Sequence, residues 1–110
     1  MITYKPGNVV LLAFPFTDGI RQKQRPALVL IDTGDPDIVV ARITSQLYTT
    51  AFDVALSDQA EAGLLLPSVV RLHKLATLEK GTVSRCLGHL SAQDWARVRS
   101  VLNALWSLSQ

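Results

Sequence analysis

The sequence lacks features that mark several large protein classes. Its 110 residues include a single cysteine, Cys86, so no disulfide can form within the chain. No apolar stretch approaches the ~20 residues that a membrane span requires, and Met1 to Lys5 do not begin a signal-peptide pattern. These absences argue against a disulfide-stabilised secreted scaffold and against a membrane partner, and they lead us to expect a cytoplasmic protein.

The chain also lacks internal repeats, low-complexity tracts and linkers, whereas 48% of its residues are hydrophobic. This composition is typical of a folded domain and argues against a disordered chain. A chain of this length buries about two-thirds of the surface that it exposes when unfolded. We therefore expect a single domain over residues 1–110.

An excess of charge of one sign is absent too, since the net charge is only +2, but the charges are unevenly distributed. Residues 1–30 carry four basic side chains and one acidic one (+3), residues 31–61 one and six (−5), and residues 62–110 six and two (+4). Basic segments on both sides of an acidic one are consistent with a polyanion bound to one face. Solubility alone explains the same pattern.

Short runs of β-forming residues, separated by turn sequences, predict about six strands. The polar, basic segment 18–24 predicts a long exposed hairpin loop between the first two strands. The runs are 9–14, 26–31, 38–44, 52–56, 68–72 with a bent continuation past Ala76, and 82–84 with 87–90 leading out of it.

The C-terminal residues predict a helix over about 91–107. Ser91 is the expected N-cap, and Asp94 at the third helical position can complete a shortened capping box. The apolar residues of this segment recur at helical spacing and form one stripe: Trp95, Val98, Leu102 and Leu105. Strands followed by one helix predict a mainly β fold, a small and strongly bent barrel with the helix packed on its sheet.

Candidate functional side chains lie where predicted strands begin or end. Arg25 precedes Pro26 at the start of a strand, so its guanidinium has a rigid base and can bind a phosphate through two hydrogen bonds. Such a fork also stabilises the additional charge of a phosphorane-like transition state. Thr44 and Ser45 follow a strand, and their hydroxyls can bind a phosphate oxygen. A surface ion pair for Arg25 and ordinary turn hydrogen bonds for Thr44 and Ser45 are the alternatives.

Arg71 and His73 are two positions apart in a predicted strand, so their side chains share one face, opposite to Val70 and Leu72. Histidine titrates near neutral pH, so it can take a proton from a 2′-hydroxyl or give one to a leaving 5′-oxygen. The alternative is a solvated histidine near the edge of the sheet. No cysteine, histidine and carboxylate residues have metal-ligand spacing, so we expect neither a metal nor a cofactor.

In the order and spacing of five segments, the chain resembles the MazF/PemK toxins of type II toxin–antitoxin systems. The resemblance implies an SH3-like barrel with a C-terminal helix, usually homodimeric, that is neutralised by a cognate antitoxin. It also implies metal-independent cleavage of single-stranded mRNA, leaving 2′,3′-cyclic phosphate and 5′-hydroxyl ends and inhibiting translation and growth. The segments are Lys-Pro-Gly-Asn-Val-Val at 5–10 with 14–19, Arg-Pro-Ala-Leu-Val-Leu at 25–30, Thr-Ser-Gln at 44–46, residues 67–74, and Leu-Gly-His-Leu-Ser at 87–91.

The resemblance also implies roles for single residues. Arg25 matches the arginine that contacts the scissile phosphate, and Thr44 matches the hydroxyl residue beside it. Arg71 matches the arginine of an arginine–aspartate acid–base pair, whereas His73 stands in the place of the aspartate. Imidazole there either acts as the base with a different pH optimum or weakens the site. The implied RNA-binding residues are Arg21, Lys23, Ser45, Gln46 and Lys74.

Two other functions stay open at this point. CcdB-like toxins poison a protein target, gyrase, and depend on C-terminal aromatic and small residues, of which this chain has Trp106. A homologue that binds RNA without cleaving it would result if His73 has replaced a carboxylate that catalysis needs.

Overall fold

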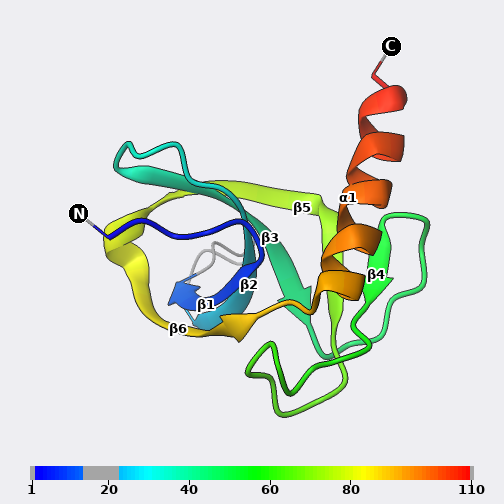
Figure 1. Ribbon diagram of the computed structural model, residues 1–110, viewed down its shortest axis with the longest axis horizontal. Coiled ribbons are helices and arrows are strands. Elements are labelled where there is room, and N and C mark those ends of the chain that lie inside the picture. Colours follow the sequence, from blue (N-terminus) through cyan, green and yellow to red (C-terminus); the bar gives the residue numbers. More distant parts are fainter. Residues whose placement is uncertain (1, 14–22, 110) are drawn as a thin grey trace.

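The computed structural model describes residues 2–13 and 23–109 (Figure 1). All the predicted strands are present, although the last one begins later than expected, because a 3-10 turn at Lys80–Thr82 precedes it. Phe14 and most of the predicted loop 18–24 lie outside the described residues. In chain order the elements are β1 (Asn8–Ala13), β2 (Gln24–Ile31), β3 (Asp37–Thr44), β4 (Asp53–Ala55), β5 (Val69–Glu79), β6 (Val83–His89) and α1 (Ala92–Ser107).

The strands form one antiparallel sheet in the order β4-β5-β3-β2-β1-β6. The sheet bends strongly round itself, and α1 lies outside it beside β4 and β5 (Figure 1). A register shift in β5, opposite the step from Ala41 to Arg42, contributes a local irregularity to this bend. The predicted mainly β fold with a C-terminal helix is confirmed. The barrel is open, because β4 and β6 are the two edges of the sheet.

Both faces of β1, β2 and β3 carry buried side chains, which explains why these three strands are largely apolar. Alternate residues of β2 enter different clusters, because successive side chains of a strand point to opposite faces. Leu28 and Leu30 pack in the cluster that includes Val98 of α1, whereas Ala27 and Val29 pack in a second cluster. The helix packs on the first cluster only, and the bend of the sheet encloses the second cluster.

The helix begins as expected, but its first acidic residue has a different role. The Ser91 hydroxyl accepts the N–H of Asp94 at 3.1 Å. The Asp94 carboxylate, which is fully buried, accepts the N–H and hydroxyl of Ser57 and the N–H of Asp58 instead of completing a capping box. Burial alone would raise the pKa of this carboxyl group, but the hydrogen bonds and Arg97 outweigh it and lower the pKa. In the described part of the chain, no helix has the length and apolarity that a membrane crossing requires.

The segment between β4 and β5 joins the two edges of the sheet. The N–H of His89 in β6 donates to the carbonyl of Glu61 at 3.2 Å. Gly63 has a φ of +78°, and a Cβ built on it would lie 2.1 Å from the carbonyl oxygen of Leu87. A Cβ on Gly88 would lie 2.4 Å from the carbonyl oxygen of Glu61. Two glycines therefore allow the backbones to touch, and this contact positions residues 64–68 beside the candidate site.

Candidate functional site

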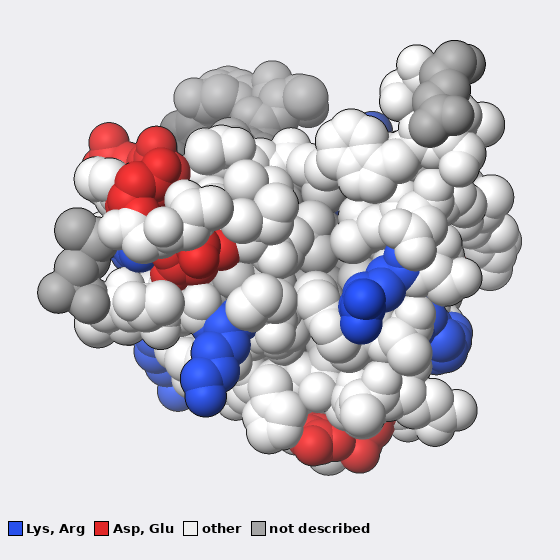
Figure 2. All heavy atoms as spheres, turned by 45° about the horizontal axis from the view of Figure 1, so that its top comes forward, with Lys and Arg blue, Asp and Glu red and all other residues white. Residues whose placement is uncertain are grey.

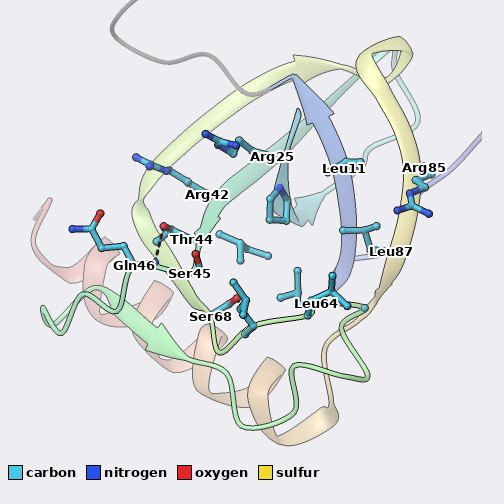
Figure 3. Close-up of a pocket in the computed structure, with 15 residues that line it drawn as sticks. Leu11, Arg25, Arg42, Thr44, Ser45, Gln46, Leu64, Ser68, Arg85 and Leu87 are labelled. Carbon is cyan, nitrogen blue, oxygen red and sulfur yellow. Dashed lines mark hydrogen bonds between the residues drawn. The ribbon is translucent and has the colours of Figure 1, made fainter. Parts of the chain in front are cut away.

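A pocket of about 660 Å3 opens at the end of the sheet where β1 and β3 end and β2 and β5 begin (Figure 3). Its lining combines three arginines with hydroxyl, amide and leucine side chains, and no acidic residue is among the lining residues that the structure describes. A lining rich in arginine side chains favours an anionic ligand. The lining residues are Leu11, Arg25, Pro26, Arg42, Ile43, Thr44, Ser45, Gln46, Gly63, Leu64, Leu65, Leu66, Ser68, Arg85 and Leu87.

Strand register explains why Arg25 and Thr44 are neighbours. Ala27 of β2 is paired with Arg42 of β3, and the same antiparallel register continued by two residues sets Arg25 opposite Thr44. Paired residues of an antiparallel sheet share a face, so both side chains are on one side of the sheet. The Thr44 hydroxyl accepts the N–H of Gln46 at 3.1 Å, a bond that leaves the hydroxyl hydrogen for donation.

Four of the side chains selected from the sequence therefore meet at the pocket: Arg25, Thr44, Ser45 and Gln46. Arg71, His73, Lys23 and Lys74 are not among its lining residues. Lys23 and Lys74 are exposed, the first just before β2 and the second on β5. Arg21 lies outside the described residues.

Sequence reasoning missed two arginines of the pocket. Arg42 is two positions before Thr44, so the alternation of side chains in a strand was a signal that could have found it. Arg85 reaches the pocket because distant strands pair: Leu11 of β1 is opposite Pro26 of β2 and also opposite Arg85 of β6. No local pattern reveals that register.

Arg71 lies one strand away from the pocket and is engaged by its own neighbours. It is opposite Arg42 in β3 and opposite Asp53 in β4. Its Nε donates to Asp53 Oδ1 at 2.9 Å, its Cζ is 3.7 Å from the centre of the Tyr48 ring, and only 8% of the residue is exposed. We expected an outward-projecting Arg71; Val70 and Leu72 are buried as expected, but Arg71 is covered as well.

The Asp53 carboxylate neutralises this arginine. Burial would raise the pKa of Asp53, but hydrogen bonds from Thr50 and Arg71 outweigh that effect and hold the pKa below its usual value. The group is therefore ionised at neutral pH and serves as a fixed negative charge. Because 18 residues separate Asp53 from Arg71, no local pattern indicated the pair.

His73 is exposed, with its Nε2 3.4 Å from Nη2 of Arg71 and its ring centre 5.3 Å from that of Phe52. Partial burial of the imidazole, and then the charge of Arg71, lower the pKa of His73 below 6.5, although Asp53 acts in the opposite direction. The neutral imidazole therefore predominates at pH 7. Since a guanidinium only donates hydrogen bonds, Nε2 is the acceptor in this contact.

The charges over one face of the molecule stand apart from one another. Figure 2 shows lysine and arginine side chains separated by uncharged surface, while the acidic side chains gather in two places. Across the described ranges, no three histidine, cysteine or acidic side chains are grouped so that they could hold a metal ion.

Comparisons with known proteins assign a class to this small, strongly bent antiparallel sheet with one C-terminal helix. A family model described as "PemK-like, MazF-like toxin of type II toxin-antitoxin system" matches residues 5–106. The chain belongs to this family, as the resemblance predicted. A comparison with curated proteins found no significant match.

Solved structures share the fold at low sequence identity. The chain is similar to the Mycobacterium tuberculosis toxin MazF-mt6, with a TM-score of 0.75, 23% identity, and 91% of this chain and 96% of that chain covered. It is also similar to MazF from Deinococcus radiodurans, with a TM-score of 0.76, 25% identity and coverage of 97% and 99%. A mycobacterial endoribonuclease in complex with its cognate antitoxin gives 0.73, 20%, and 93% of both chains.

Proposed function

We propose that this toxin is an endoribonuclease that cleaves single-stranded RNA without a metal ion and leaves 2′,3′-cyclic phosphate and 5′-hydroxyl ends. One observation carries the proposal: Arg25 and Thr44 converge on a pocket that is lined by arginines, with no carboxylate among its described lining residues. A phosphodiester is the ligand whose charge and shape fit such a lining. The gene-level consequence is inhibition of translation and growth.

In this reaction the 2′-oxygen attacks phosphorus, the bond from phosphorus to the 5′-oxygen breaks, and a proton moves from the attacking to the leaving side. Charge builds on the non-bridging oxygens at the transition state, where the Arg25 fork and the Thr44 hydroxyl bind it. Arg25 is half-buried at the start of β2, and Thr44 is the last residue of β3, so strands carry both donors. Donors held in place before the step act without reorganising during it.

Cleavage of a mixed-sequence RNA under single-turnover conditions in EDTA tests this function. We expect cuts with cyclic phosphate on the 3′ ends, and mapping the cuts on a long transcript defines the preferred sequence. RNA that stays intact, or that is cut only after a divalent metal is added, would refute the proposal.

We assign the proton-accepting role to His73, beside a positioning role for Arg71. His73 is on β5, outside the lining of the pocket, so this role requires RNA that extends from the pocket over β5. A neutral imidazole can take the 2′-hydroxyl proton at Nε2 when the RNA displaces the contact with Arg71, and a pKa below 6.5 keeps it in that form at pH 7. Protonation at lower pH removes the base. The single-turnover rate is therefore expected to be level near pH 7–8 and to fall tenfold per pH unit once the pH drops below the pKa of His73.

Two histidine variants separate this role from a structural one. His73→Gln is expected to lose the acidic limb of the pH profile together with about 10²–10⁴-fold of the rate. His89→Gln is the matched control, because His89 is on β6 and contacts Glu61 at 3.0 Å instead of Arg71, and it should keep the wild-type profile. If His73→Gln cleaves at the wild-type rate and pH dependence, His73 is not the base. If only His73→Asp cleaves, the natural protein is an RNA-binding homologue with a weakened site.

A cognate antitoxin is the proposed protein partner. The mycobacterial endoribonuclease was solved in complex with its antitoxin, and related structures from Deinococcus radiodurans are MazE–MazF complexes. An acidic, largely unfolded antitoxin segment would order on binding and compete with RNA for the arginines of the pocket. We propose a homodimer as the functional unit and the cytoplasm as its location.

A further inference from the structure

The three arginines of the pocket come from two sides of the sheet. Arg42 shares a face with Arg25 and Thr44, whereas Arg85 pairs with Leu11 and shares the opposite face with it. In Figure 3 the guanidinium groups of Arg25 and Arg42 lie together on one side of the pocket, and that of Arg85 lies on the other side. The pocket therefore presents two separate cationic positions.

Arg42 has a like charge as its cross-strand neighbour, which is unfavourable unless a counter-charge is present. Asp53 provides that counter-charge to the neighbour, Arg71, through an ion pair of 2.9 Å. Cross-strand pairing therefore sets four residues in one row across β2, β3, β5 and β4: Ala27, Arg42, Arg71 and Asp53. The Asp53 carboxylate at the end of this row neutralises Arg71. Arg42 stands on the side of this row nearer to Arg25, where it lines the pocket.

Arg85 is exposed on β6, and three strand spacings separate β6 from β3 in the order of the sheet. At about 4.8 Å for each spacing, the backbones that carry Arg42 and Arg85 are about 14 Å apart along the sheet. The same pocket is also lined by the leucine side chains Leu11, Leu64 and Leu87. One phosphate bound by both arginines would leave these leucines uncovered, whereas a nucleotide between two phosphates would contact them.

We propose that Arg42 and Arg85 bind two different phosphates of the RNA, with the nucleotide between those phosphates held against the leucines. Arg42 shares its phosphate with Arg25. This inference rests on the proposed function, because it extends the same RNA site. It assigns binding roles to two side chains and a path to the RNA, which crosses the pocket from β3 to β6.

Binding of a 2′-O-methylated, mixed-sequence RNA tests the proposal without cleavage, because this RNA lacks the attacking hydroxyl. We expect Arg42→Ala and Arg85→Ala each to weaken binding roughly tenfold. Each should also reduce the slope of log affinity against log salt by about 0.7, the contribution of one phosphate contact in a single strand. The double variant should lose roughly a hundredfold and about 1.4 of slope, because independent contacts add. Arg25→Ala combined with Arg42→Ala should lose less than the product of the single losses.

Arg99→Ala is the matched control, since Arg99 is exposed on α1 and is not a lining residue of the pocket. It should bind as wild type does. Arg42→Lys keeps the charge, so it should keep the salt slope even if the fork is lost. Thermal unfolding of each variant identifies any that fail to fold, and Arg42→Gln and Arg85→Gln, which also remove the charge, then replace them.

Wild-type affinity in both alanine variants would overturn the proposal, and so would a double variant no weaker than either single one. An acidic peptide that depends on both arginines while the RNA does not would overturn it too. If the RNA results are as expected but unmodified RNA is never cleaved, the proposed function fails and this inference stands. If RNA is cleaved while the alanine variants bind RNA as wild type does, the proposed function stands and this inference fails.

Discussion

Replacing Arg25 with alanine is expected to slow RNA cleavage by about 10²–10³-fold, the usual cost of removing one fixed donor to a developing oxyanion. The guanidinium is at the start of β2, on the face of the sheet that it shares with Thr44, so its removal takes away one of the donors to this phosphate. The measurement is the single-turnover rate at saturating enzyme. Arg25→Lys should recover part of the rate, because a lysine retains the charge but not the two-pronged geometry.

Arg99→Ala and thermal unfolding are the controls for this prediction. Arg99→Ala also removes one arginine charge, but from α1 and not from the pocket, so it should cleave at the wild-type rate. Equal rates for Arg25→Ala and wild type, with both folded, would mean that the reaction takes place elsewhere.

Gly63→Ala is expected to lower the free energy of unfolding by about 3 kcal/mol, the upper range for backbone strain or overpacking. The φ of +78° disfavours any side chain, and the added Cβ would lie 2.1 Å from a backbone oxygen of Leu87, which cannot turn aside. Urea unfolding measures the change. Since Gly63 precedes Leu64, we also expect weaker RNA binding, because the apolar wall of the pocket would move with the segment.

Gly81→Ala is the matched control for this effect. Nothing lies within 4 Å of a Cβ at that position, so its stability should stay close to that of wild type. Gly88→Ala should resemble Gly63→Ala, because its Cβ would meet the same contact from the other side, 2.4 Å from the carbonyl oxygen of Glu61. A Gly63→Ala protein as stable as wild type would show that the contact between this segment and β6 is not needed.

The elements of the fold could be predicted because their signals are local. Apolar runs bounded by turns gave the strands, and helical spacing with an N-cap serine gave α1. Contacts that depend on pairing of distant segments were not predictable. Asp94 illustrates this: its position suggested a capping box, but its carboxylate binds Ser57, 37 residues away. The open barrel could not be predicted for the same reason, because no local sequence pattern shows whether the two edge strands pair.

The candidate site likewise contains some residues that single positions of the sequence identified and others that depend on strand pairing. Resemblance to a family selected Arg25 and Thr44 from single positions, and the register of β2 and β3 accounts for their proximity. The partner of Arg71 could not be inferred, because Asp53 reaches it only through the pairing of β4 with β5. Arg85 was missed for a similar reason, since its place at the pocket depends on β1 lying between β2 and β6.

The central claim is that one phosphodiester is held between the Arg25 guanidinium and the Thr44 hydroxyl. A crystal structure of the protein with a bound 2′-O-methylated RNA tests it most directly. The account predicts a phosphate within hydrogen-bonding distance of both side chains, with its neighbouring nucleotide against the leucines of the pocket. RNA bound on another surface, with no phosphate near either Arg25 or Thr44, would contradict it.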